Sequence, residues 1–114
     1  MNSFTLEQQK VALTVEAGVC RFRSKVTSWV EDGLLKCSIE SNCKHVQELG
    51  RSLESINIEM MDILKMPFSE NQVYIIGGRT LKHSTCPLPM AVLKSFEAAA
   101  GLGLKRDVSV VFEK

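Results

Sequence analysis

Hydrophobic and polar residues alternate in four stretches of the chain, and such alternation is typical of strands that bury one face. The stretches are 10–16, 20–30, 34–40 and 107–112. The residues expected to face inward are Val11, Leu13 and Val15 in the first, Cys20, Phe22, Val26 and Val30 in the second, Leu35, Cys37 and Ile39 in the third, and Val108, Val110 and Phe112 in the last. The pattern therefore predicts an antiparallel sheet with one apolar face.

The sequence Asp32-Gly33 separates the second stretch from the third, and this dipeptide favours a two-residue hairpin turn. A turn centred there fixes the register of the two strands. The expected cross-strand pairs are Val30 with Leu35, Ser28 with Cys37, Val26 with Ile39, and Lys25 with Glu40. The first three pairs lie on the apolar face and the last is a favourable charge pair on the other face.

Helical spacing of apolar residues takes over in the middle of the chain. We expect a helix over 43–55 capped by Ser41-Asn42, a short helix around Ile58–Leu64 that ends near Met66-Pro67, and a last helix that begins at Ser84-Thr85-Cys86-Pro87 and stops at Gly101. Residues 68–82 fit a glycine-weakened helix, with a strand over 73–76 as the alternative. Strands precede helices, which predicts a single α+β domain over 1–114, with a three- to four-stranded antiparallel sheet and helices packed on one face. Residues 1–8 are expected to be a disordered tail.

Composition narrows the class of protein. The chain has 114 residues, 45% hydrophobic and 24% charged, and a formal net charge of +1. These values are typical of a globular domain and exclude a chain that is disordered throughout. No apolar run is long enough for a membrane span, and the first ten residues lack the apolar core of a secretory signal, so we expect a cytoplasmic protein.

Partners are less clearly indicated by the sequence. Basic residues on the polar sheet face, among them Arg21, Arg23 and Lys25, could form a nucleic-acid patch, but the near-zero net charge favours a solvated face instead. Met60-Met61 and Met66 are typical of adaptable core packing, with a contact between two copies of the chain as the alternative. The expected partners are thus another protein or a homodimer, with neither membrane nor nucleic acid.

The most unusual feature is a set of four cysteines, Cys20, Cys37, Cys43 and Cys86, with no Cys-x-x-Cys pair. In the predicted register the start of one hairpin strand lies beside the end of the other, so Cys20 and Cys43 are expected at the same end of the sheet. Cys43 and Cys86 each lie at a predicted helix start, where free N–H groups stabilise a thiolate. The alternative is that all of these residues are ordinary small core residues.

The remaining candidates differ in their placement. Cys37 lies in the middle of a strand and is expected to be a core residue. His83 precedes Cys86 by three residues, a spacing that suits either a shared metal or an ordinary loop histidine. His45 follows Cys43 by two residues, and such positions do not share a helix face, so we expect it to be solvated.

Together these motifs resemble the TSCPD domain, over roughly residues 18–97. They are also similar to a small uncharacterised family of archaeal and anaerobic bacterial proteins, through Ala17-Gly18-Val19-Cys20 and the His-x-x-Cys-Pro-x-Pro run over 83–89. The resemblance implies a zinc or iron–sulfur site in a domain without assigned catalysis. The implied ligands are Cys20, Cys43 and Cys86, with His83 as the fourth. A further cysteine of the TSCPD pattern is missing here, so either His83 replaces it, or the site has three ligands, or metal binding has been lost.

Three functions follow from these observations. The first is a small metal-binding module that uses cysteines at strand and helix ends. The second is a metal-free interaction or structural subunit whose cysteines only pack. The third is a thiol enzyme or redox sensor with Cys43 or Cys86 as nucleophile and His83 as base. No paired-carboxylate or Ser-His-Asp pattern is present, which argues against catalysis of those kinds.

Overall fold

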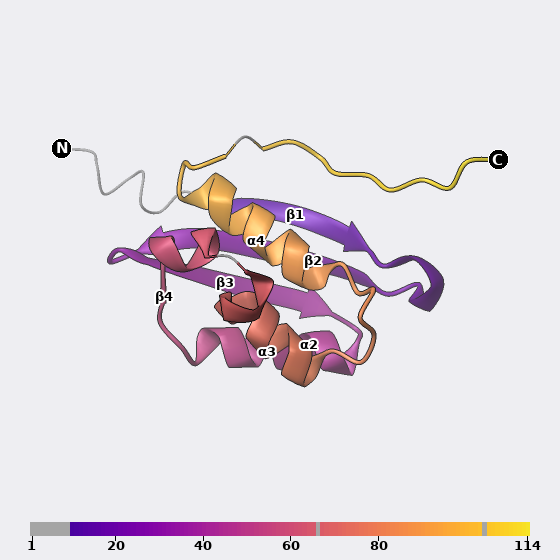
Figure 1. Ribbon diagram of the computed structural model, residues 1–114, viewed down its shortest axis with the longest axis horizontal. Helices are drawn as coiled ribbons and strands as arrows, with labels where there is room; N and C mark the ends of the chain where they lie inside the picture. The colour runs from indigo at the N-terminus through magenta and orange to yellow at the C-terminus, as the bar shows by residue number, and fades with distance from the viewer. Residues whose placement is uncertain (1–9, 66, 104) are drawn as a thin grey trace.

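Figure 1 shows the computed structural model, which describes residues 10–65, 67–103 and 105–114. The strands are β1 (Val11–Glu16), β2 (Arg23–Glu31), β3 (Leu34–Ser41) and β4 (Ile58–Glu59). The helices are α2 (Lys44–Glu54), α3 (Gln72–Thr80) and α4 (Leu88–Ala99), with short 3₁₀-helices η1 (Gly18–Cys20), η2 (Met60–Leu64) and η3 (Phe68–Glu70). The predicted α+β class is confirmed. Residues 1–8, expected to be a tail, lie outside the described residues.

The β2–β3 hairpin follows the predicted register at every pair. Val30 lies opposite Leu35 and Lys25 lies opposite Glu40. Both turn residues have positive φ, 55° at Asp32 and 79° at Gly33, as a type I′ turn requires. This turn matches the twist of the strands and so fixes the register of the sheet centre.

The remaining strands pair antiparallel to give the order β1-β2-β3-β4. β1 is an edge strand, and its inward residues are covered unevenly. Val15 is buried, whereas Val11 and Leu13 are only half-buried. β4 contributes two residues, which pair with Leu34 and Leu35. Of the two edge strands, β1 is therefore the longer one, with six residues against two in β4.

Helices α2 and α4 cover the inward face of the sheet (Figure 1). Their buried residues include Val46, Leu49 and Leu53 on α2 and Leu88, Val92 and Phe96 on α4. Gly50 lets α2 approach closely, because a Cβ there would lie 3.3 Å from Ile39 Cβ. A buried hydroxyl pair, Ser28 Oγ to Ser95 Oγ at 2.7 Å, links β2 to α4. Within the described part of the chain, none of the helices combines the length and apolar character needed to cross a bilayer.

The opposite face of the sheet is open and carries paired charges. Arg23 Nη2 donates to Glu16 Oε2 at 2.6 Å. Lys10 Nζ lies 4.6 Å from the ring centroid of Trp29, whose Nε1 donates to Glu31 Oε1 at 3.0 Å. Arg23 and Lys10 on this face therefore have an acidic and an aromatic partner, respectively.

The connection between α2 and α4 differs in part from the prediction. The short helix expected around Ile58–Leu64 is confirmed in part, because Met60–Leu64 forms the 3₁₀-helix η2, whereas Ile58 extends the sheet. A reciprocal capping contact starts that turn, with the Glu59 N–H donating to Asp62 Oδ2 at 2.9 Å. Met66 of the methionine group lies outside the described residues. The helix expected within 68–82 is confirmed as α3, which Asn71 caps by accepting from the Val73 N–H at 3.0 Å.

Helix α4 ends at Gly101, as predicted. Gly101 has φ 75°, its N–H bonds to the Ala98 carbonyl at 3.2 Å, and the Leu102 N–H bonds to the Glu97 carbonyl at 2.8 Å. This is the Schellman pattern, in which a left-handed residue satisfies the last carbonyls.

The strand predicted over 107–112 is wrong. These residues pair with no strand, and Val110 and Phe112 are 90% and 94% exposed. In Figure 1 the segment leaves the end of α4 and runs in the same direction as β1 without joining the sheet. Its alternation specifies an apolar face, but nothing in the described chain covers that face.

Candidate functional site

Cys43 lies where β3 passes into α2. The helix begins at Lys44 and Cys43 is its N-cap, so the predicted cap at Ser41-Asn42 stands one to two residues early. Ser41 still organises the junction, because its Oγ accepts from the Cys43 N–H at 3.1 Å and from Ser24 Oγ at 2.9 Å. Its carbonyl accepts from Gln47 Nε2 at 2.7 Å. The half-buried Cys43 side chain packs against the core from this fixed position.

Cys86 lies at the end of the loop that joins α3 to α4. The helix begins at Leu88 with Pro87 as N-cap and Pro89 in its first turn, slightly later than predicted. The Cys86 N–H donates to the His83 carbonyl at 3.1 Å, which closes a tight turn before the helix. Like Cys43, the Cys86 side chain is half-buried against the core.

Cys20 ends η1 and is exposed, so its predicted position on the buried face of a strand is wrong. The chain folds into a small loop here, with Gly18 and Arg21 at φ 84° and 62° and the Arg21 N–H donating to the Gly18 carbonyl at 2.9 Å. The loop interrupts the strand pattern predicted from residue 20, so β2 begins only at Arg23. The β2–β3 ladder ends with Ser24 opposite Ser41, so neither Cys20 nor Cys43 takes part in it.

The three segments nevertheless meet at one end of the molecule. In Figure 1 the β1–β2 connection, the start of α2 and the start of α4 all lie at the right-hand end. Burial raises the pKa of Cys86, the Leu88 N–H lowers it, and the nearby Cys43 and Cys20 raise it further. The segments that carry Cys20, Cys43 and Cys86 therefore lie at one end of the fold, where the predicted register placed the first two residues.

This shift also corrects one expectation from the sequence. The donor at the helix start does favour the Cys86 thiolate, as predicted, but loss of solvent outweighs that effect. At neutral pH the thiol is therefore held more firmly protonated than a free cysteine. A bound cation would reverse this balance, because it compensates for both the burial and the repulsion among thiolates.

The histidines and Cys37 complete the set. His83 and His45 are both exposed. Cys37 is 5% exposed in the core, which confirms the packing prediction, and burial followed by the nearby Glu54 raises its pKa to about 12. Among residues 10–65, 67–103 and 105–114, no three Cys, His, Asp or Glu side chains converge on a point that could hold a metal ion. Cys20, Cys43 and Cys86, which we call the cysteine cluster, therefore do not form a closed ligand sphere.

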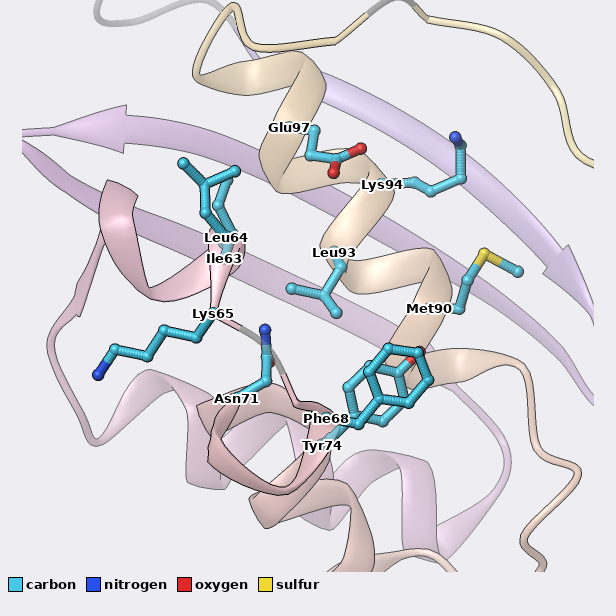
Figure 2. A pocket seen from close by; sticks show the side chains of 10 residues that line it. All are labelled: Ile63, Leu64, Lys65, Phe68, Asn71, Tyr74, Met90, Leu93, Lys94 and Glu97. Carbon is cyan, nitrogen blue, oxygen red and sulfur yellow. The ribbon is translucent and has the colours of Figure 1, made fainter.

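A pocket of about 320 Å³ lies on the helical side, and sequence reasoning did not find it. It opens between η2, η3, α3 and α4, and the stacked rings of Phe68 and Tyr74, 4.9 Å between centroids, form one wall (Figure 2). Met90 and Leu93 contribute from α4. The signal available in the sequence was weak: two of the chain's few aromatic residues, six positions apart across a helix start.

Comparison with known proteins assigns the chain to a family. Residues 11–112 match the model of a family of unknown function, DUF6951, and the chain belongs to this family. No curated protein and no solved structure matches it. The resemblance to the TSCPD domain stays a prediction.

Proposed function

We propose that this chain is a small metal-binding module in which Cys20, Cys43 and Cys86 hold zinc or an iron–sulfur centre, with His83 as the fourth ligand. The observation that supports it most directly is the gathering of three thiols, from three separate segments, at one end of the fold. Thiolate is the preferred donor for both kinds of centre.

Three thiols and an imidazole are suitable donors for a soft metal. In the described part of the chain, however, no three of these donors converge on one point. Cys43 and Cys86 are anchored by hydrogen-bonded turns, whereas Cys20 is exposed on η1. Binding would therefore require η1 and the exposed His83 to close over the two anchored thiols. A zinc ion held by four ligands would stabilise the fold, and an iron–sulfur centre would supply electron transfer or cluster delivery.

Metal analysis of anaerobically purified protein tests this proposal. We expect stoichiometric zinc or iron in the wild type and its loss in Cys43→Ser and Cys86→Ser. Cys37→Ala is the matched control, because Cys37 is buried outside the cluster, and this variant should retain the metal. A metal-free wild type with four titratable thiols would contradict the proposal.

A metal-free interaction subunit is the second candidate. It is favoured by the large apolar side chains exposed beside the pocket, Leu64 and Phe68 among them. The thiol-enzyme alternative has less support, because the raised pKa of Cys86 works against an activated thiolate. The free state of all four cysteines fits a cytoplasmic location, which we propose with the metal-binding function.

A further inference from the structure

The outer edge of β1 carries unused strand-pairing capacity. Among the described residues, β1 pairs only with β2. Its inward residues Val11 and Leu13 remain half-buried, whereas Val26 on the neighbouring strand is fully buried. The helices therefore cover the β1 edge of the sheet incompletely. An added strand with apolar residues on its inward face would bury the apolar side chains there.

The C-terminal segment 107–112 has the complementary properties. It has six residues, as β1 does, and both would span roughly 20 Å as strands. Val108, Val110 and Phe112 share one parity, and Asp107, Ser109 and the apolar Val111 share the other; all four apolar side chains are at least half exposed. An exposed segment of this kind is prone to pair with a free strand edge.

The family match includes both the β1 edge and the C-terminal segment. It begins at residue 11, the first residue of β1, and ends at residue 112, the last of the segment. The C-terminal segment thus belongs to the unit that the family model describes and is not an appended tail. Both the free edge and the unpaired segment are parts of the same domain.

We infer that segment 107–112 of one copy of this chain adds as a strand to the β1 edge of a second copy, and reciprocally, to form a strand-exchanged dimer. Val108, Val110 and Phe112 would then cover Val11 and Leu13 beneath the helical layer. Because each copy gives one segment and accepts one, the contact closes on two chains under two-fold symmetry.

The direction of the segment explains why the acceptor is a second copy. Within its own chain the segment belongs to the stretch that leaves the end of α4 and runs in the same direction as β1 (Figure 1). Antiparallel pairing with its own β1 would require it to start a full strand length away, at the other end. A second copy supplies the antiparallel orientation that the rest of the sheet uses.

Sedimentation equilibrium of the full-length chain, with paired variants, tests this inference. We expect a dimer for the wild type and a roughly 100-fold weaker association for Val110→Asp/Phe112→Asp, because two carboxylates would enter the apolar layer. Val111→Asp is the matched control. It lies on the same segment with the opposite parity, would face the open side of the sheet, and should remain dimeric.

Hydrogen exchange of the 107–112 amides distinguishes exchange between copies from pairing within one chain. We expect protection that increases with protein concentration. A wild type that is monomeric at all concentrations would overturn the inference, as would a protected segment in a monomer. Equal dissociation by Val111→Asp would also overturn it, because that result indicates non-specific adhesion. Cys43→Ser should remain dimeric, which separates this result from the metal proposal.

Discussion

Segments 10–16 and 107–112 have nearly the same pattern and different fates. Both place three apolar residues at alternate positions, yet the first contains β1 and the second pairs with nothing in the described chain. β1 is joined to β2 by the tight η1 loop, in which the Ala17 N–H donates to the Phe22 carbonyl at 3.2 Å. The C-terminal segment follows a helix after which the chain runs in the same direction as β1, which is the wrong direction for antiparallel pairing with that strand.

The difference separates two kinds of information in a sequence. Alternation specifies which face of a strand is apolar, and the connection to the preceding element decides whether a partner is within reach. A short connection provides that partner in the same chain. Where it does not, the pattern is better taken as evidence for a partner in another chain.

The largest expected contrast is between two phenylalanines. Phe96 is fully buried on α4, and Phe96→Ala should lower the free energy of unfolding by about 3–5 kcal/mol through lost contacts and a cavity. Phe112→Ala should leave the intrinsic stability of a monomer within about 0.5 kcal/mol and change only its concentration-dependent part. Urea denaturation at several protein concentrations measures both. A large loss for Phe112→Ala in dilute protein would remove the distinction between the two regions.

Alkaline pH should lower the free energy of unfolding through ionisation of the Cys37 thiol on β3. The pKa of Cys37 is raised to about 12 in the folded chain from 9.0, so its stabilising contribution is complete below pH 9 and is lost as the pH rises towards 12. Between pH 8 and pH 10 the wild type should lose roughly 1 kcal/mol more of its free energy of unfolding than Cys37→Ala does. Denaturant titrations of both proteins at the two pH values give this difference. Parallel pH profiles would show that burial of Cys37 does not control its ionisation.

The smallest single effects are expected at two glycines without close neighbours. Gly101→Ala should cost about 1 kcal/mol, because φ 75° strains a side chain at the point where the C-terminal segment leaves α4. Gly78→Ala, inside α3 with open space around it, should instead stabilise by roughly 0.5–1 kcal/mol. Thermal unfolding of the two variants should therefore shift in opposite directions. A shift in the same direction would show that helix ends and interiors do not differ here as argued.

Sequence reasoning succeeded where local chemistry fixes geometry. The Asp32-Gly33 turn specified the register of the central hairpin, and Gly101 specified the end of α4. It failed at Cys20, because positive φ at Gly18 and at Arg21 interrupts an alternation that looks continuous in one dimension. Arg21 gave no signal, since non-glycine residues seldom adopt that conformation.

The candidate site was predictable to a similar extent. Strand register alone brought Cys20 and Cys43 to one end of the sheet, and their joint effect on Cys86 fits that placement. The exposure of Cys20 and of His83 depends on loop geometry, which spacing does not encode. The pocket beside Phe68 escaped prediction because its walls come from segments that become neighbours only through tertiary packing.

The contact of Lys10 with Trp29 has a practical consequence. Trp29 is the only tryptophan of the chain, so the indole emission of the whole protein arises beside the strand that ends the sheet. Detachment of β1 would withdraw the ammonium group from the ring and change the emission. The protein thus contains an intrinsic fluorescent probe of that strand, which needs no added label and responds on the timescale of mixing.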